Sequence, residues 1–387
     1  MTDNKGPLSG YRVLDMTAIV MGPYATQILG DMGADVIKVE RPEGDQQRYS
    51  PPSRHPTMNA VFLNLNRNKR GITLDLKNRE HIAWVEDYLQ GCDVLVHNLR
   101  PGVMEGLGLG SNRLRAANPR LVYCNLSAFG PGGPMQRNPG YEPMVQAFAG
   151  LFSINGYPDR PGARIGTSVL DLGSAVWAAL GCMTALYQRE RTGKGCVVDA
   201  SLYETALGLL TVHFARFQAS GELPERHPSG SLAVVIFQAF DTTDGQVIVA
   251  AANDRLFAKF ANEVSCPEWV QDPRYKTNAD RHANKDTLLP MVADIMRRHT
   301  SETWVARLEK AGVPCAAIND LAHMRNNPQT AALGMVQPVP GIDLGLMSLP
   351  LSLDGERPSI RARAPELGEH NATLPGLPKS KAEGASG

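Results

Sequence analysis

Apolar residues gather in short blocks along the first half of the chain, and the blocks alternate between two kinds of spacing. Residues 11–17 (YRVLDMT) and 34–40 (ADVIKVE) are short apolar runs typical of buried strands. Between them, residues 25–33 (ATQILGDMG) have helical spacing and end at Gly33, a residue type that commonly terminates helices. This strand–helix–strand order predicts a parallel sheet covered by helices.

The same alternation continues further along the chain. Helical spacing returns at 79–92 and 111–119, and each stretch is followed by a strand-like apolar run, at 93–99 and 120–130. The chain through about residue 205 is therefore predicted to form one α/β domain.

A different pattern begins after a polar stretch. Residues 216–231 are rich in Pro, Gly and Ser and are predicted to be a linker. Residues 235–252 predict a hairpin that turns at Asp244–Gly245. The helices predicted beyond it span 254–265, 284–300 and 301–312. Together they predict a smaller α+β domain at 232–330, whereas residues 371–387 predict a disordered tail.

The composition narrows the class of partner. The 387 residues are 43% hydrophobic, and 39 Lys and Arg balance 39 Asp and Glu. That balance argues against nucleic acid and against a charged membrane surface as partners. The N-terminal residues lack a secretory pattern and the apolar runs are shorter than the ~20 residues of a membrane span, so we expect a cytoplasmic protein. The six cysteines show no metal-ligand spacing, so no metal site is predicted.

The glycine-rich residues do not form a nucleotide-binding motif. GLGLG at 106–110 resembles a dinucleotide loop, but it does not follow a strand at the required distance and lacks the downstream acidic residue. The chain has neither a Walker A motif nor a GxSxG nucleophile motif. Dinucleotide, triphosphate and serine-hydrolase chemistry are therefore disfavoured.

Basic residues follow several of the predicted strands. Lys38 and Arg41 end the second strand, residues 67–77 hold four more cations, and Asn98 and Arg100 follow a later strand. Ligands of open α/β sheets bind at the carboxyl ends of the strands, and cations gathered there suit a phosphorylated ligand. The alternative is solvated charge at loop ends, and composition alone leaves both interpretations open.

One carboxylate stands alone in an apolar segment. Asp171 is the single charged residue of GTSVLDLGSAVWAALG, at 166–181. The positions that follow it at helical spacing are Leu172, Ala175, Val176, Ala179 and Leu180. Asp171 therefore sits at or just before the first turn of a helix. It is interpreted as an N-terminal cap that accepts backbone N–H bonds, as a nucleophile that attacks an activated carbonyl, or as both.

Many segments together carry a resemblance to a known family. They are GYRVLDMTAIVMGPYATQILGDMGADVIKVERPEGD, LNLNRNKRGITLDLK, DVLVHNLRPGVMEGLGLG, NPRLVYCNLSAFGPGGP, GTSVLDLGS, RTGKGCVVDASLYE, QAFDTTDGQVIVAAANDRLF, AGVPCAAINDL and, last, LGEH. From Leu8 to about Asn371, the chain resembles the class III CoA-transferases, the group that includes formyl-CoA:oxalate and carnitine CoA-transferases.

The resemblance implies a reaction and the residues that carry it. Asp171 falls where these enzymes carry their nucleophilic aspartate, and Glu142 where they carry an active-site carboxylate. The implied enzyme moves CoA from an acyl-CoA donor to a free carboxylic acid through aspartyl anhydride and aspartyl-CoA thioester intermediates. No permanently bound cofactor is implied, because coenzyme A enters with the acyl-CoA substrate. The residues that match the family's CoA contacts are Val20, Met21, Arg41, Leu74, Lys77, Asn98 and Leu99, with Arg100 as a further phosphate contact.

The resemblance also implies an architecture. We expect an interlocked homodimer in which each chain has a Rossmann-like, CoA-binding large domain at 1–215 and the small α+β domain at 232–330. Residues 331–370 are expected to return to the large domain.

Two alternatives remain open. An α-methylacyl-CoA racemase shares the fold, but the histidine base of such an enzyme is replaced here by Tyr141, just before Glu142. Tyrosine is a poor base at neutral pH. A non-catalytic acyl-CoA-binding protein would keep the fold without needing the Asp171 carboxylate.

Overall fold

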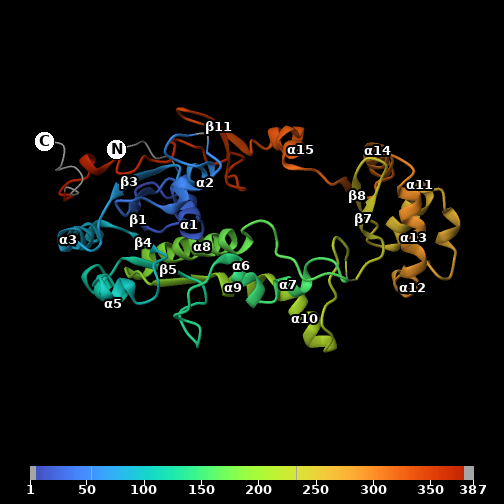
Figure 1. Cartoon of the computed structure of the whole chain (residues 1–387), viewed down its shortest axis with the longest axis horizontal. Helices are drawn as coiled ribbons and strands as arrows, with labels where there is room; N and C mark the ends of the chain where they lie inside the picture. Colours follow the sequence, from blue (N-terminus) through green and yellow to red (C-terminus); the bar gives the residue numbers. More distant parts are fainter. Residues whose placement is uncertain (1–5, 54, 232, 379–387) are drawn as a thin grey trace. The chain divides into compact units, whose positions relative to one another are not determined.

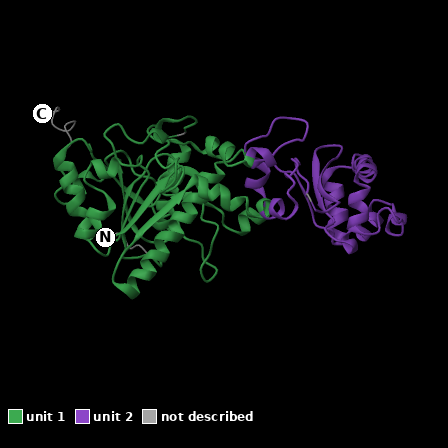
Figure 2. Cartoon of the chain, turned by 90° about the horizontal axis from the view of Figure 1, so that it is seen from below, with its two compact units in different colours: residues 1–151, 165–214, 328–387 green, residues 152–164, 215–327 purple. Residues whose placement is uncertain are grey.

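The chain folds into two compact units, which are coloured separately in Figure 2. The computed structural model describes residues 6–53, 55–231 and 233–378. Unit 1 comprises residues 1–151, 165–214 and 328–387, and unit 2 comprises 152–164 and 215–327. The chain therefore leaves unit 1 twice. The first excursion, at 152–164, lies inside the segment that the sequence assigned wholly to the large domain.

Unit 1 is built on a six-stranded parallel sheet (Figure 1). Its strands are β1 (Arg12–Met16), β2 (Asp35–Glu40), β3 (Lys69–Thr73), β4 (Val94–His97), β5 (Val122–Ser127) and β6 (Val197–Ser201). They are arranged in the order β3-β2-β1-β4-β5-β6, and all neighbours pair in parallel. This order is that of doubly wound, Rossmann-like sheets. The predicted α/β class with a parallel sheet is confirmed.

Helices cover the sheet and connect its strands. Those that precede residue 221 are α1 (Met21–Asp31), α2 (Ala60–Leu65), α3 (Arg79–Tyr88), α4 (Val103–Gly106), α5 (Ser111–Ala117), α6 (Glu142–Phe148), α7 (Leu151–Ile154), α8 (Val169–Thr192), α9 (Leu202–Leu209) and α10 (Thr211–Ser220), with short 3₁₀ turns η1 (Gln46–Tyr49) and η2 (Leu89–Gly91). The central strands carry apolar residues without alternation because both faces are covered. Leu14 and Leu95 accordingly have no exposed surface.

Helix α8 is the longest element, with 24 residues, and packs against α1, β5, β6 and α9. It approaches β6 closely at Gly181, where a Cβ atom would lie 2.6 Å from Cγ1 of Val198. By length and composition α8 is apolar enough to cross a membrane, which differs from our expectation that every apolar run is too short. Its contacts with the sheet and with α1 are those of a helix in a protein core.

The C-terminal segment belongs to unit 1 and is more ordered than the sequence predicted. It contains the hairpin β10 (Val336–Val339) and β11 (Ile342–Met347), the helix α16 (Pro328–Ala332) and the turn η4 (Asn371–Thr373). Residues 371–378 are not a disordered tail. Asn371 exchanges two hydrogen bonds with Thr73, and Leu374 is buried in the core beside Trp84. The backbone polar groups at the end of β3 and this apolar side chain provide the contacts that order the segment. The rest of the predicted tail, 379–387, lies outside the described residues.

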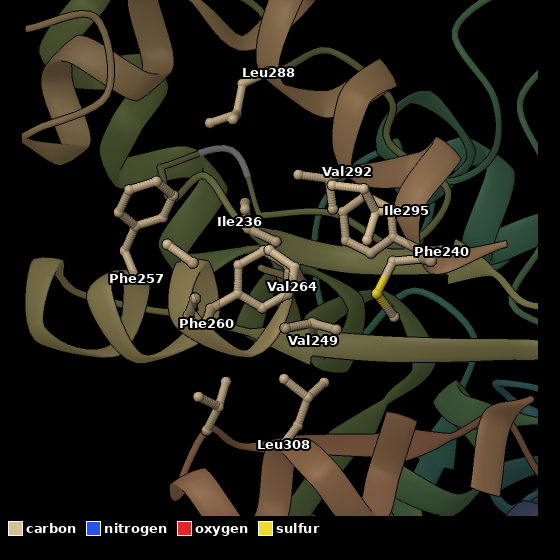
Figure 3. Close-up of a cluster of buried hydrophobic side chains, with 14 of the residues drawn as sticks. Ile236, Phe240, Val249, Phe257, Phe260, Val264, Leu288, Val292, Ile295 and Leu308 are labelled. Carbon is tan, nitrogen blue, oxygen red and sulfur yellow. The ribbon is translucent and has the colours of Figure 1, made fainter. Parts of the chain in front are cut away.

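Unit 2 is an α+β structure around its own core (Figure 3). Its antiparallel sheet contains β7 (Phe237–Asp241), β8 (Gln246–Ala250) and β9 (Cys315–Ala317), and its helices are α11 (Asp254–Glu263), α12 (Asn278–Ala283), α13 (Lys285–Met296), α14 (Ser301–Ala311) and α15 (Leu321–Asn326), with η3 (Pro267–Val270). The predicted hairpin turn is confirmed, since Thr242 N donates to Gly245 O across 2.9 Å. The predicted linker at 216–231 begins within α10, and its residues 221–231 are free of helix and strand.

Candidate active site

A cavity of about 720 Å³ lies at the carboxyl ends of four neighbouring strands. The segments that line it follow β1 at 17–19, β2 at 40–46, β3 at 74–77 and β4 at 98–99. The strand order reverses its direction between β1 and β4. Such a switch point is where open α/β sheets bind their ligands. The fold therefore places a ligand cavity at the position that general topology predicts.

Most of the residues that the sequence assigned to CoA lie at this cavity. Those that line it are Arg41, Leu74, Lys77, Asn98 and Leu99. Val20 and Met21 begin α1, directly after the lining residue Ile19. Arg100 is exposed, follows Leu99 in the chain and is not among the lining residues. The cavity thus brings together five of the eight positions and leaves three beside it in sequence.

The basic residues after the strands divide into two groups. Three are buried in ion pairs whose side chains are at most 2% exposed: Lys38–Asp45 at 3.1 Å, Lys69–Asp15 at 2.9 Å and Arg67–Asp31 at 2.7 Å. These cations do not face solvent, so the interpretation as solvated charge was wrong for them. Their carboxylate partners hold them in place because an unpaired buried charge is strongly destabilising.

Two exposed cations remain at the cavity wall. Arg41 is more than half exposed, and its Nε donates to Gly44 O across 3.0 Å, which leaves its terminal nitrogens for other partners. Lys77 is exposed, and its backbone N donates to the Asp75 carboxylate in the turn that precedes α3. Cations in this setting suit the phosphate groups of a ligand.

Asn98 is bound to the neighbouring loop through its side chain. Its Oδ1 accepts from Ala18 N at 3.0 Å, and its Nδ2 donates to Ala18 O at 2.8 Å. Asn98 therefore joins the end of β4 to the end of β1 in addition to lining the cavity. The sequence assigned it only a ligand contact.

The second cluster surrounds the start of α8, where Asp171 lies in the first turn. Ser168 is the N-cap residue of this helix and makes no side-chain capping bond. Instead, Glu142 from the start of α6 supplies the acceptor, because its Oε1 receives a hydrogen bond from Leu170 N at 3.3 Å. The interpretation of Asp171 as the N-terminal cap is therefore wrong. The capping carboxylate comes from another helix.

Asp171 is left available for chemistry. Among the residues that the structure describes, none donates a hydrogen bond to its carboxylate. Burial, and after it the neighbouring charge of Glu142, raise the pKa of Asp171 to about 6. Both effects outweigh the positive end of the helix, which favours an ionised carboxylate. Asp171 and Glu142, predicted as catalytic residues, thus form a carboxylate pair.

Gln146, in the next turn of α6, holds Glu142 in place. Its Nε2 donates to Glu142 Oε1 at 2.6 Å, and its Oε1 accepts from Ile165 N at 2.9 Å. Gln146 has no exposed surface. It therefore connects α6 to the strand-like segment that leads into α8.

Aromatic side chains pack around the same helices. Phe148 at the end of α6 meets Phe129 and Tyr203 with ring centroids 5.4 Å apart in each case. Tyr203 belongs to α9, and α6 and α9 both contact α8 (Figure 1). These rings connect α6 with α9.

The cavity and the carboxylate pair share one edge of the sheet. Helix α8 leads into β6 and packs on it, so it runs opposite to the strands, and its first turn lies toward their carboxyl ends. Both features belong to unit 1. An α/β protein with a cavity and a carboxylate pair at one edge of its sheet is the class that this fold and site define.

Comparison with known proteins gives the family. The model of CoA-transferase family III matches residues 8–371, and the chain belongs to this family. It is an acyl-CoA:carboxylate CoA-transferase, as the resemblance implied. The alternatives of a racemase and of a non-catalytic binding protein are therefore set aside.

The chain is similar to relatives of several sources. It is 36% identical over 374 residues to the acetyl-CoA:oxalate CoA-transferase of Acetobacter aceti, covering 96% of this chain and 95% of that protein. It is 33% identical over 349 residues to the succinyl-CoA:glutarate CoA-transferase of Mus musculus, covering 90% and 80%. The crystal structure of a CaiB/BaiF family protein from Brucella suis superposes with a TM-score of 0.87 at 32% identity, covering 95% and 98%.

The sequence analysis missed part of the cavity wall. Ile19 and Asp45 line the cavity, and neither was singled out. Asp45 lies in a Pro- and Gly-containing turn after β2, a position typical of ligand loops. Ile19 gave no signal, because its unusual backbone conformation cannot be recognised from its identity.

Proposed function

We propose that Asp171 is the nucleophile of a double-displacement transfer of coenzyme A. The observation that carries this proposal is that the two carboxylates at the start of α8 have different hydrogen-bond partners. Glu142 accepts the backbone N–H bond there, so the Asp171 carboxylate is uncommitted. With its pKa raised to about 6 by burial and Glu142, Asp171 is mostly ionised at neutral pH and more basic than an ordinary aspartate.

The proposed reaction has four displacements. The Asp171 carboxylate attacks the thioester carbonyl of the donor, the C–S bond breaks and CoA thiolate leaves an aspartyl–acyl anhydride. The thiolate attacks the aspartyl carbonyl, forming an aspartyl-CoA thioester and releasing the donor acid. The acceptor carboxylate then displaces CoA thiolate to form a second anhydride. Attack of the thiolate on the acceptor's acyl carbon completes acceptor-CoA and restores Asp171.

The four displacements need no reactant beyond the two substrates and the Asp171 carboxylate. Each displacement exchanges one carboxylate or thiolate for another, so no proton is consumed and no nucleotide is cleaved. Water competes with the thiolate for the anhydride, and the burial that raises the pKa of Asp171 disfavours that competition. Arg41 and Lys77 are proposed to hold the phosphates of coenzyme A at the cavity, with the pantetheine arm reaching toward α8.

The proposed acid substrates are small dicarboxylic acids. The two relatives described above are named for oxalate and glutarate, both dicarboxylic acids. We also propose that the chain works as an interlocked homodimer. Two observations support this proposal. The chain leaves unit 1 at two places, at 152–164 and at 215–327. Helices α8 and α9 also expose apolar side chains.

Replacing the nucleophile tests the mechanism. Asp171→Asn is expected to lower the transfer rate by at least about a thousandfold, while the dissociation constant for free CoA changes less than about threefold. Transfer is read as isotopic label passing from an acyl-CoA to a second acid, over a panel of CoA esters and dicarboxylic acids. Trapping with hydroxylamine during turnover is expected to modify residue 171, detected by peptide mass spectrometry.

Arg41→Ala is the matched control for this experiment. It is expected to keep the trapped Asp171 adduct at saturating donor and to raise KM for every CoA ester. Transfer by Asp171→Asn at a rate near that of the wild type, or a hydroxylamine adduct on another residue, would remove Asp171 from its proposed role.

A further inference from the structure

The loop between β1 and α1 has an unfavourable backbone conformation at the cavity. Residues 17–19 form one wall, and Ile19 adopts a φ of 75°. This left-handed region is costly for any residue with a Cβ and most of all for a β-branched one. A conformation of this kind persists only where surrounding contacts impose it.

Asp45, in the turn after β2, supplies those contacts. Its two carboxylate oxygens both lie 3.2 Å from Ile19 N, so the amide is held by a charged acceptor. The Asp45 side chain is 1% exposed. It also accepts from Gln47 N at 3.0 Å, which fixes its own turn.

A buried countercharge pairs with Asp45 in this position. Lys38, with no exposed side-chain surface, donates to Asp45 Oδ2 at 3.1 Å and to Thr17 O at 3.0 Å. Lys38 therefore contacts both walls as well. Hydrogen bonds to charged groups in such dry surroundings are strong and directional.

The turn that carries Asp45 is itself held by buried hydrogen bonds. Asp45 N donates to Glu40 Oε2 at 3.0 Å, and Arg48 binds the same Glu40 carboxylate through two nitrogens at 2.6 and 2.7 Å. The side chain of Arg48 is 1% exposed. The turn that carries Asp45 is consequently rigid enough to position Ile19.

We propose that Asp45 is a positioning residue of the coenzyme A site: by holding the Ile19 amide, it sets the backbone of residues 17–19 in the shape that receives the ligand. The inference rests on the proposed function, in which this cavity binds coenzyme A. Asp45 acts on binding and not on the displacement steps, because it lies in the cavity wall and the reactive carboxylate is on α8.

Asp45→Asn tests the positioning role. The amide replaces one acceptor oxygen by a donor and leaves Lys38 without its countercharge. We expect KM for acyl-CoA and the dissociation constant of free CoA to rise about tenfold or more, with kcat within about twofold of wild type. Asp31→Asn is the matched control, since it breaks a buried pair with Arg67 at the other end of α1, away from the cavity. It is expected to lower Tm without changing KM.

A double-variant cycle separates positioning from direct ligand contact. Glycine adopts the left-handed conformation without strain, so in an Ile19→Gly background the backbone needs less support. We expect Asp45→Asn to raise KM in that background by less than a third of its effect in the wild-type background. An equal effect in both backgrounds would overturn the proposal, because Asp45 would then act independently of the strained residue.

Comparing the KM values of Arg41→Ala and Asp45→Asn distinguishes failure of the positioning role from failure of the proposed CoA site. If Arg41→Ala raises KM and Asp45→Asn does not, the positioning role falls while the proposed CoA site stands. If neither variant changes KM, the cavity is not the CoA site and both fall. Should Asp45→Asn fail to fold, Asp45→Glu keeps the charge beside Lys38 but displaces the oxygens from Ile19 N. It too is expected to raise KM, and an unchanged KM would overturn the proposal.

Discussion

At the scale of single residues, the two carboxylates at the start of α8 have different partners. Glu142 is engaged by Leu170 N and Gln146, whereas the Asp171 carboxylate receives no hydrogen bond from the described part of the chain. The same negative charge that caps the helix also raises the pKa of Asp171. A structural group and a reactive group are thereby coupled through their charges.

This coupling predicts a change in pH dependence for Glu142→Gln. Asp171 reacts in its ionised form, so kcat/KM for the wild type is expected to fall as the pH drops below about 6. Glutamine keeps an oxygen for Leu170 N but removes the negative charge, so the pKa of Asp171 decreases and the acid limb moves to lower pH. Burial still holds that pKa above its ordinary value. The measurement is kcat/KM from about pH 4.5 to about pH 9.

Gln146→Glu is the reciprocal variant. It adds a negative charge beside Glu142 and is expected to shift the acid limb of kcat/KM to higher pH, because a like charge disfavours ionisation of the carboxylates nearby. Acid limbs that coincide in wild type, Glu142→Gln and Gln146→Glu would show that these side chains do not control the ionisation of Asp171.

At this scale, the sequence did not predict which partners the side chains have. The resemblance assigned roles to Asp171 and Glu142, and only the structure shows which of them caps α8. The buried cations show the same limit. Lys69 pairs with Asp15, which lies 54 residues away, so no local pattern could reveal the pair or the burial of both charges.

At the scale of elements, α8 positions the reactive carboxylate through close packing. Small side chains bring the helix near its neighbours, and Gly181 faces Val198 of β6. Gly181→Ala is expected to lower stability, because the added methyl would lie 2.6 Å from a stiff valine side chain. Overpacking costs about 1–3 kcal/mol and exceeds the gain of roughly 1 kcal/mol in helix propensity. The measurement is Tm, with a decrease of a few degrees expected.

Gly106→Ala provides the matched comparison. Gly106 ends α4, and a Cβ there would meet no atom within 4 Å. This variant is expected to leave Tm unchanged or slightly raised. A Tm for Gly181→Ala at or above the wild-type value would show that α8 and β6 separate readily, contrary to the packing described.

The face that α8 buries could not be derived from its spacing. Ala175 and Ala179 are buried as predicted, but Val176 and Leu180 are about half exposed. The buried face is completed by Ser174, Ala178 and Cys182 instead. A helix that is apolar on all sides gives no periodic contrast, and close packing against α1 favours the small residues over the large ones. The strands β1 and β2 were predicted well because continuous apolar runs are diagnostic of a covered parallel sheet.

At the scale of the whole molecule, the exposed apolar surface of unit 1 needs a partner. On α8 the large side chains that are 47–61% exposed are Val176, Trp177, Leu180 and Tyr187. On the following helices Leu207, Leu209, Val212 and Phe214 are 46–68% exposed. Helices α8 and α9 pack against each other, so the exposed groups on these two helices lie on neighbouring elements. Monomeric proteins seldom leave so much apolar surface in water, and a second copy of the chain is the proposed cover.

The interlocked form of that dimer makes a prediction that an ordinary dimer does not. Light scattering coupled to size exclusion is expected to give twice the chain mass of 41.9 kDa at every concentration down to the nanomolar range. If the two chains thread through each other, they cannot separate without unfolding. Two preparations with different tags, mixed in native buffer for days, should therefore yield no mixed dimer, whereas joint refolding from denaturant should yield all three combinations. Exchange in native buffer would mean that the subunits meet only at their surfaces, and a mass of one chain would leave the apolar helices without their proposed cover.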